Sequence, residues 1–224
     1  MKLRYRITYK KNQAMRYTSS LDLHKVWERS FRRANLPLAY SQGYHPQPKL
    51  QPAISLPLGF LGENELLDIY LTEEVPLLDL MQRISSNVPN GLEILSVSQV
   101  LENEPALQVQ AMSSYYRVIL LEPQNENVIQ SNIDLFLSST SLIRERRGKQ
   151  YDLRPLVFDI KIQKNTAPLE LWIHLCTKES ASGRPEEVLN VLGIPFQLTR
   201  IIRTEILLSN TQEITKPDNC YEHN

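Results

Sequence analysis

The stretch LRYRITYKKNQAMRYTSSLDLHKVWERSFRRA, residues 3–34, places an alternating pattern of hydrophobicity directly before a helical one. Over residues 3–10 each apolar residue is followed by a basic or polar one, which is the period of a half-buried β-strand. Ser19 with Asp22 three residues later is typical of a helix N-terminus, and Pro37 cannot continue a helix. Between them the apolar residues recur at helical spacing and form one stripe: Leu23, Val26, Trp27, Phe31 and Ala34. The chain is therefore predicted to begin with a strand, followed by a helix over about residues 20–34.

The residues up to about 100 extend this beginning to a β-α-β-β-α-β order. We expect an edge strand over residues 53–58, a turn at 62–64, a strand over 65–72, a short helix after Pro76 and a strand over 91–100. This order is the split pattern of a ferredoxin-like unit.

The second half of the chain repeats that order in pattern, without clear residue-by-residue identity. Residues 115–121 are predicted to form a strand, 125–139 an amphipathic helix, 156–162 and 169–177 a hairpin pair, 185–192 a short helix and 196–208 a closing strand. The predicted fold class is therefore α+β, with tandem ferredoxin-like units, predominantly antiparallel sheets and helices on one face. We expect one unit over residues 1–104, including a proline-rich loop at 36–60, a second over 105–208, and a polar, disordered tail at 209–224.

Composition excludes several classes of protein. The chain has 224 residues, of which 42% are hydrophobic and 22% charged, as in ordinary globular proteins. No apolar run is long enough to span a bilayer, and the N-terminal residues lack the apolar block of a signal peptide. The 2 cysteines, Cys176 and Cys220, stand far apart with the second in the polar tail, and two such residues do not form the spacing pattern of a metal or disulfide framework. We therefore expect a cytoplasmic protein that does not enter a membrane and holds no cofactor of its own.

A net charge of zero conceals a strong separation of charge along the chain. Residues 1–50 contain eleven Lys and Arg against two acids, a net charge of +9. Residues 51–112 contain one Arg against nine acids, a net charge of −8. Either the two segments neutralise each other in the fold, or the first forms a positive surface.

The segment LPLAYSQGYHPQPKLQPAISLPLGF, residues 36–60, contains five of the 14 prolines. Proline excludes a helix here and restricts the loop before any ligand arrives, which lowers the entropy lost on binding. On the preceding helix, basic residues at i, i+4 and i+8 form a ridge along one flank. We predict a binding surface made of the loop, the ridge and one preceding arginine: Arg16, Lys25, Arg29, Arg33, Tyr40, Tyr44, His45 and Lys49. The alternative is that the tyrosines pack under the loop and His45 caps a turn.

Catalytic chemistry has weaker support. His45 and Lys49 are the only candidates on the loop, the first as an acid or base near neutral pH and the second as a phosphate contact. His174 lies in LELWIHLCT, residues 169–177, where a half-buried sheet face is the better interpretation. Phosphate-binding glycine loops, the HExxH and GxSxG motifs and the cysteine spacing of an iron–sulfur cluster are all missing.

Two further sets of basic residues have two interpretations each. Arg4 and Arg6 are expected on the sheet face away from the helices, either paired with Asp68 across strands or forming a basic platform beside Tyr70. A basic run surrounds a hairpin-like turn at Gly148, either as a solvated turn or as a second phosphate contact: Arg144, Arg146, Arg147 and Lys149.

Several short motifs carry a resemblance to a known family. They lie mostly in residues 15–71 and continue downstream: Arg16-Tyr17, Leu21-Asp22-Leu23, Arg32-Arg33-Ala34, Leu36-Pro37-Leu38-Ala39-Tyr40-Ser41, Gly43-Tyr44-His45-Pro46, Pro48-Lys49-Leu50, Leu56-Pro57-Leu58-Gly59, Leu67-Asp68, Tyr151-Asp152-Leu153-Arg154-Pro155, Arg184-Pro185 and Arg203-Thr204-Glu205. The chain resembles the radical SAM-associated domains of unknown function, an uncharacterised bacterial family fused to, or partnered with, radical SAM proteins of cobalamin-binding type. The family often has His where this chain has Ser20.

The resemblance implies a radical SAM protein as a partner, fused or separate, which would carry an iron–sulfur cluster, S-adenosylmethionine and cobalamin. Together with the basic, aromatic surface it favours a non-catalytic accessory module that binds RNA, such as tRNA or rRNA, or presents it to the radical SAM enzyme. One alternative is a metal-independent endoribonuclease of tandem ferredoxin-like type, with His45 or His24 as the general base and Lys49 or Arg16 stabilising charge. Another is a protein-docking domain for the radical SAM partner.

Overall fold

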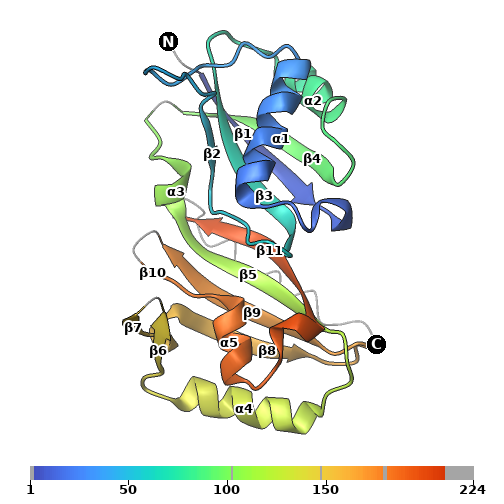
Figure 1. Cartoon of the computed structure of the whole chain (residues 1–224), viewed down its shortest axis with the longest axis vertical. Coiled ribbons are helices and arrows are strands. Elements are labelled where there is room, and N and C mark those ends of the chain that lie inside the picture. Colours follow the sequence, from blue (N-terminus) through green and yellow to red (C-terminus); the bar gives the residue numbers. More distant parts are fainter. Residues whose placement is uncertain (1–2, 102, 147, 179–180, 210–224) are drawn as a thin grey trace.

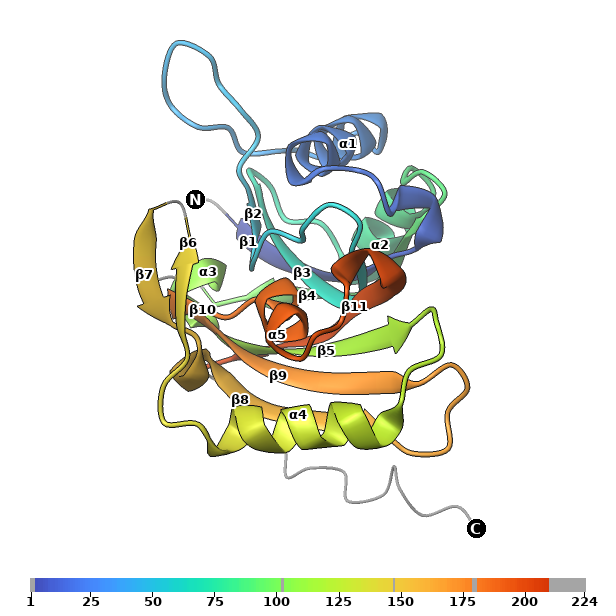
Figure 2. The ribbon, with the colours of Figure 1, turned by 60° about the horizontal axis from the view of Figure 1, so that its bottom comes forward.

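In the computed structural model, which describes residues 3–101, 103–146, 148–178 and 181–209, two halves share one long sheet (Figure 1). The first half consists of β1 (Leu3–Lys11), α1 (Ser20–Arg33), β2 (Leu50–Pro52), β3 (Leu61–Leu71), α2 (Leu77–Ser85) and β4 (Leu92–Val100). Its strands lie in the order β2-β3-β1-β4, and each neighbouring pair is antiparallel. The segment between α1 and β2 projects from the body of the molecule (Figure 2).

The second half has the same order of elements and of strands. After α3 (Leu107–Gln110) come β5 (Ala111–Leu120), α4 (Glu126–Ser138), β8 (Val157–Gln163), β9 (Glu170–Lys178), β10 (Ala181–Ser182), α5 (Pro185–Val191) and β11 (Thr199–Leu208). Its main strands lie in the order β8-β9-β5-β11, again with antiparallel neighbours. A hairpin of β6 (Ile143–Arg146) and β7 (Lys149–Asp152) is inserted between α4 and β8. The predicted α+β class, with a largely antiparallel sheet, is confirmed.

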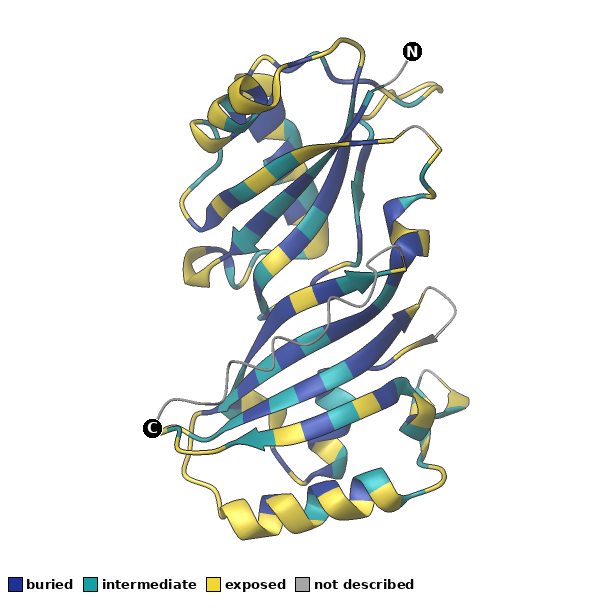
Figure 3. Ribbon diagram, turned by 180° about the vertical axis from the view of Figure 1, so that it is seen from behind, coloured by how far each residue is buried: buried dark blue, intermediate teal, exposed yellow. Residues whose placement is uncertain are grey.

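Hydrophobic periodicity accounts for the two cores. In the first half, α1 and α2 bury their apolar stripes on one face of the sheet, where Trp27, Phe31 and Leu80 pack with Ile7 and Ile69. In the second half, residues of α4 and α5 form a cluster with alternate residues of β5, β8 and β9. All four of these helices lie on the same side of the sheet (Figure 1), and none of the described helices covers the rear face (Figure 3).

The halves are joined by backbone pairing and by a buried ion pair. β11 and β3 are parallel neighbours through Ile202↔Leu61 and Arg203↔Gly62, which makes one sheet of 9 strands. Arg203 of β11 is 1% exposed and contacts Glu65 of β3, which is 2% exposed, through Nε–Oε1 at 2.8 Å and Nη2–Oε2 at 2.5 Å. Because both charges are removed from water, each depends on the other.

On the rear face of the first half, Asp68 binds both arginines of β1. Its oxygens accept from Arg4 Nε at 2.7 Å and from Arg6 Nε at 2.8 Å, and the carboxylate has no exposed surface. Arg4 Nη1 also donates to the carbonyls of Glu104 and Pro105, which holds the segment between the halves against the sheet. The cross-strand pairing is thus confirmed, and these two arginines form no free basic platform.

Some predicted boundaries were wrong. Residues 53–58 are irregular, because β2 ends at Pro52, which has no N–H to donate. Residues 62–64 form no turn: β3 already begins at Leu61, since Gly62 pairs with Lys11 on one side and with Arg203 on the other. Arg147 and residues 210–224 of the predicted tail lie outside the described residues. None of the described helices is long and apolar enough to cross a membrane.

Candidate nucleic-acid interface

Residues 39–49 of the proline-rich segment form a narrow loop with two hydrogen-bonded arms, called the ribbon, which extends from the end of β3 (Figure 2). Its arms are joined by Ser41 N–H donating to Gln47 O at 2.8 Å and Lys49 N–H donating to Ala39 O at 2.9 Å. The base is tied to the sheet, because Ala39 N–H donates to Tyr70 O at 2.7 Å and Tyr70 N–H to Lys49 O at 3.3 Å. The loop therefore has a defined backbone where it leaves the body of the protein.

Aromatic side chains at the ribbon are open to solvent. Tyr44 is 98% exposed and Tyr40 is 40% exposed, so Tyr44 does not pack under the loop. The rings of Tyr44 and His45 meet edge to face, with centroids 6.2 Å apart. Gly43, at φ 140°, supplies the positive dihedral angle that sets up this turn. No described residue forms a hydrogen bond or ion pair with His45, so nothing orients its imidazole for acid–base catalysis.

The outward face of α1 carries the basic ridge. Because the apolar stripe with Leu23, Trp27 and Phe31 faces the sheet, the opposite side of the helix faces water. The ridge consists of four exposed basic residues: Lys25, Arg29, Arg32 and Arg33. Arg32 was not among the predicted site residues. Within the described part of the chain, only Arg33 of these four has hydrogen-bond partners: its Nη2 donates to Asn87 O at 2.8 Å and to Ser30 Oγ at 3.5 Å.

The acidic segment does not neutralise this ridge. Five of its nine carboxylates form ion pairs away from the ridge: Asp68 with Arg4 and Arg6, Glu65 with Arg203, Glu63 with Arg117, Glu93 with Lys10 and Asp79 with Arg83. The charge separation seen in the sequence is thus cancelled within the sheet but persists on α1. Lys49, half-buried at the base of the ribbon, also has no ion-pair partner among the described residues.

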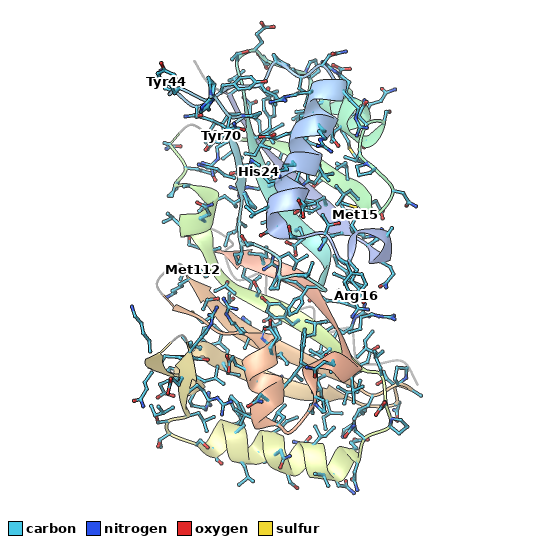
Figure 4. The ribbon with its side chains drawn as sticks, viewed as in Figure 1. Met15, Arg16, His24, Tyr44, Tyr70 and Met112 are labelled. Carbon is cyan, nitrogen blue, oxygen red and sulfur yellow. The ribbon has the colours of Figure 1, made fainter. Side chains whose placement is uncertain are left out.

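Arg16 lies apart from the other predicted site residues. Its Nε donates to Gly59 O at 2.9 Å, and its guanidinium carbon lies 5.2 Å from the centre of the Tyr17 ring. It precedes α1, whereas the ribbon follows that helix, and α1 has 14 residues, a length of roughly 21 Å. Arg16 and Tyr44 therefore stand at opposite ends of the first half (Figure 4). The ribbon follows the end of α1 that carries Arg32 and Arg33, whereas Arg16 precedes the other end.

A hollow of about 310 Å³ lies between α1 and residues 52–56. Most of its lining is apolar, and polar atoms come from Tyr9, Ser20, His24 and Ser55. His24 Nε2 lies 3.7 Å from Glu28 Oε1 at the rim. The buried indole N–H of Trp27 lies near the Tyr9 hydroxyl, but none of the described atoms accepts a hydrogen bond from it. Burial, helped by the negative charge of Glu65, raises the pKa of Tyr9, which keeps its hydroxyl neutral. Among the described residues, no group of His, Cys, Asp and Glu is arranged to hold a metal ion.

Most of the chain matches the sequence model of one protein family. The sequence model of a family described as "Uncharacterized protein conserved in bacteria (DUF2344)" matches residues 4–185, which include the ribbon, the ridge and most of both halves. The chain belongs to this family. The expected membership in an uncharacterised bacterial family is confirmed, whereas the family description names no radical SAM partner.

Other comparisons add little. No curated protein matches the sequence. Among solved structures, the chain is similar to one in the "Crystal Structure of a Cbf5-Nop10-Gar1 Complex", with 9% identity and a TM-score of 0.49. The match covers 90% of this chain and 48% of that one, so the chain spans about half the length of the structure it matches.

Proposed function

We propose that this DUF2344 protein is a non-catalytic module that binds single-stranded RNA along α1 and the ribbon and presents it to a radical SAM enzyme. The observation that carries the proposal is that Lys25, Arg29 and Arg32 of α1 are exposed without an ion-pair partner among the described residues, while five acids of residues 51–112 pair with other cations. Phosphate contacts supply most of the non-specific affinity of nucleic-acid binding.

The ridge suits a flexible polyanion. Lys25 and Arg29 are one helical turn apart, and Arg32 and Arg33 continue the ridge towards the base of the ribbon, where Lys49 lies. If Lys25, Arg29, Arg32 and Lys49 each neutralise one phosphate, the slope of log K against log salt is about −2.8 for a single strand.

The ribbon supplies a different interaction. A tyrosine that is 98% exposed gains nothing from the core, and its ring offers a face on which any base can stack. The hydrogen bonds across the arms restrict the backbone before binding, so less entropy is lost when RNA is bound. Cations at the base of the ribbon and a ring at its tip fit phosphates and bases of one strand.

The radical SAM enzyme enters the proposal from the family resemblance in the sequence. That partner, fused or separate, would carry the iron–sulfur cluster, S-adenosylmethionine and cobalamin. In the present chain Cys176 is buried, and the described residues contain no cluster of metal ligands.

The test is the fluorescence anisotropy of a labelled 12-nucleotide RNA, titrated with the protein at 50 and 200 mM salt. The triple variant Lys25→Gln/Arg29→Gln/Arg32→Gln is expected to lower the affinity at 50 mM salt by roughly tenfold or more and to flatten the salt slope. Lys164→Gln, a charge removal at an exposed lysine remote from α1, is the matched control. No binding by the wild type at 50 mM salt, or equal losses in both variants, would contradict the proposal.

The same samples distinguish the two rival functions. RNA cleaved in the presence of EDTA would favour a metal-independent endoribonuclease instead. Retention of a radical SAM partner after nuclease treatment, without RNA binding by the chain alone, would favour a protein-docking domain.

A further inference from the structure

The rear face of the second half carries a cluster of rings that the ridge and the ribbon do not explain. Tyr115 of β5 and His174 of β9 are stacked, with centroids 4.0 Å apart and an interplanar angle of 16°. Phe158 of β8 meets the other side of this pair, 4.9 Å from the His174 ring, and is 51% exposed. Trp172 is two residues before His174 on β9 and is partly exposed. We call these four residues the ring platform: Tyr115, Phe158, Trp172 and His174.

Strand register places the platform on the face without helices. Residues paired directly across strands point to the same side, and Tyr115 is opposite His174 while Arg117 is opposite Trp172. The alternate residues Tyr116, Val118 and Ile173 belong to the core under α4 and α5. In Figure 3 the strands β5, β8 and β9 are seen from this rear side, and among the described residues no helix lies in front of them.

The platform is ordered without a ligand. His174 Nε2 lies at hydrogen-bonding distance from Ser113 Oγ, 2.9 Å, and burial lowers the pKa of His174. The imidazole is therefore neutral at pH 7 and acts as a flat ring held between Tyr115 and Phe158. Burial and the carboxylate of Glu205 raise the pKa of Tyr115, so the phenol also stays neutral.

Charged groups surround Trp172 in a balanced arrangement. Arg117 and Lys161 are its cross-strand neighbours on β5 and β8. Each has an acidic partner: Arg117 Nη2 lies 2.6 Å from Glu63 Oε1, and Lys161 Nζ lies 2.6 Å from Asp159 Oδ2. Glu170 and Glu205 lie on the same face, so positive charge does not exceed negative charge here, unlike on α1, and stacking rather than counterion release must supply the affinity of this face.

We propose that the ring platform stacks the unpaired bases of a single-stranded RNA. The inference rests on the proposed function and extends it by assigning the binding of the bases to the second half. The His174 ring is already stacked with Tyr115 and contacted by Phe158, so the bases stack on the open surfaces of Phe158 on β8 and Trp172 on β9, in a second half whose main strands form a four-stranded sheet. Aromatic residues on such a sheet face stack two or three bases in RNA-binding modules of this topology.

RNA fits this face better than an apolar protein surface does. An apolar partner would remove the Arg117–Glu63 and Lys161–Asp159 ion pairs and the Glu170 carboxylate from water, which costs free energy that an apolar surface does not return. A nucleotide strand brings flat bases to the rings and leaves its phosphates in water near the guanidinium and ammonium groups. The expected binding therefore depends on bases and only weakly on salt.

The experiment uses the intrinsic fluorescence of the full chain, which has 2 tryptophans, one of them the 2%-exposed Trp27. Titration with 12-nucleotide oligouridylate and oligoadenylate at 200 mM salt should quench Trp172, and Trp172→Phe should abolish that change. Phe158→Ala is expected to weaken binding by roughly 5- to 150-fold, the range for losing one stacked base. Leu135→Ala, at an exposed apolar residue of α4 on the opposite side, is the matched control and should bind as the wild type does.

The outcomes separate this inference from the proposed function. If RNA binds but Trp172 is not quenched and Phe158→Ala binds normally, the platform is overturned while the ridge on α1 stands. If the triple ridge variant binds as the wild type does but still shows the quenching, the ridge fails and the platform stands. Equal quenching by an abasic oligonucleotide of the same length would also overturn the platform, because no bases are present to stack.

Discussion

Replacing Glu65 with glutamine should lower the free energy of unfolding by about 3–5 kcal/mol, because the change leaves the buried Arg203 guanidinium without its carboxylate. The two side chains are 2% and 1% exposed and meet in a bidentate pair, at 2.8 Å and 2.5 Å. Arg203 Nη2 also donates to Ile54 O at 2.9 Å, so the guanidinium cannot leave without breaking a further contact. For a chain of this length the loss corresponds to a fall in melting temperature of about 6–20 °C.

A double-mutant cycle in urea, followed by circular dichroism, measures the pair. For the cycle the single variants are Glu65→Leu and Arg203→Met, which should each cost a similar amount, since each leaves the other charge buried and unpaired. The double variant Glu65→Leu/Arg203→Met should recover most of the stability, because no uncompensated charge remains. Single losses below about 1 kcal/mol, or a double variant whose loss equals the sum of the two, would refute the reasoning that the pair is desolvated.

Three further changes test other parts of the structure. Gly62→Ala should destabilise the protein in the same urea assay, because a Cβ there would overlap the Glu65 side chain and displace its carboxylate; wild-type stability would contradict this. The pKa of His174 is lowered in the folded protein, so below about pH 6.5 the unfolded chain takes up a proton that the folded chain does not, and stability falls as pH falls. His174→Gln should remove that part of the pH dependence between pH 7.5 and 5.5, and an unchanged pH profile would argue against it. Tyr44→Ala should leave stability within about 0.5 kcal/mol, since the ring is 98% exposed, yet weaken RNA binding; a large loss of stability would show that the ring packs against the protein.

Much of the fold follows from local patterns in the sequence. The alternation over residues 3–10 and the stripe from Leu23 to Ala34 predict β1 and α1, and both the buried stripe and the exposed ridge are where the helical period puts them. The prolines of residues 36–60 exclude a helix and predict a loop with an edge strand; the structure has the strand β2 there and a loop that projects from the body of the molecule (Figure 2). For the candidate site, exposure of Tyr44, Lys25 and Arg29 could be predicted in the same way, because it depends on helix period and loop chemistry alone.

The sequence patterns were insufficient where partners come from distant parts of the chain. Arg16 resembled a member of the basic surface, but only the fold shows it bound to Gly59 at the other end of α1. Trp172 and His174 could be assigned to one face of a strand, and that assignment was sound. That Tyr115 and Phe158 complete a ring platform depends on which strands lie beside β9.

The sequence by itself determined the order of strands and helices and which side chains of each share a face, because those properties repeat every two or 3.6 residues along the backbone. Only the tertiary structure decided which charges are cancelled. Glu65 and Arg203 are 138 residues apart and meet because β11 lies beside β3, whereas the cations of α1 face water and find no acid among the described residues. A charge counts the same in a composition whether it is buried in a pair or free at the surface, and only three-dimensional proximity distinguishes the two.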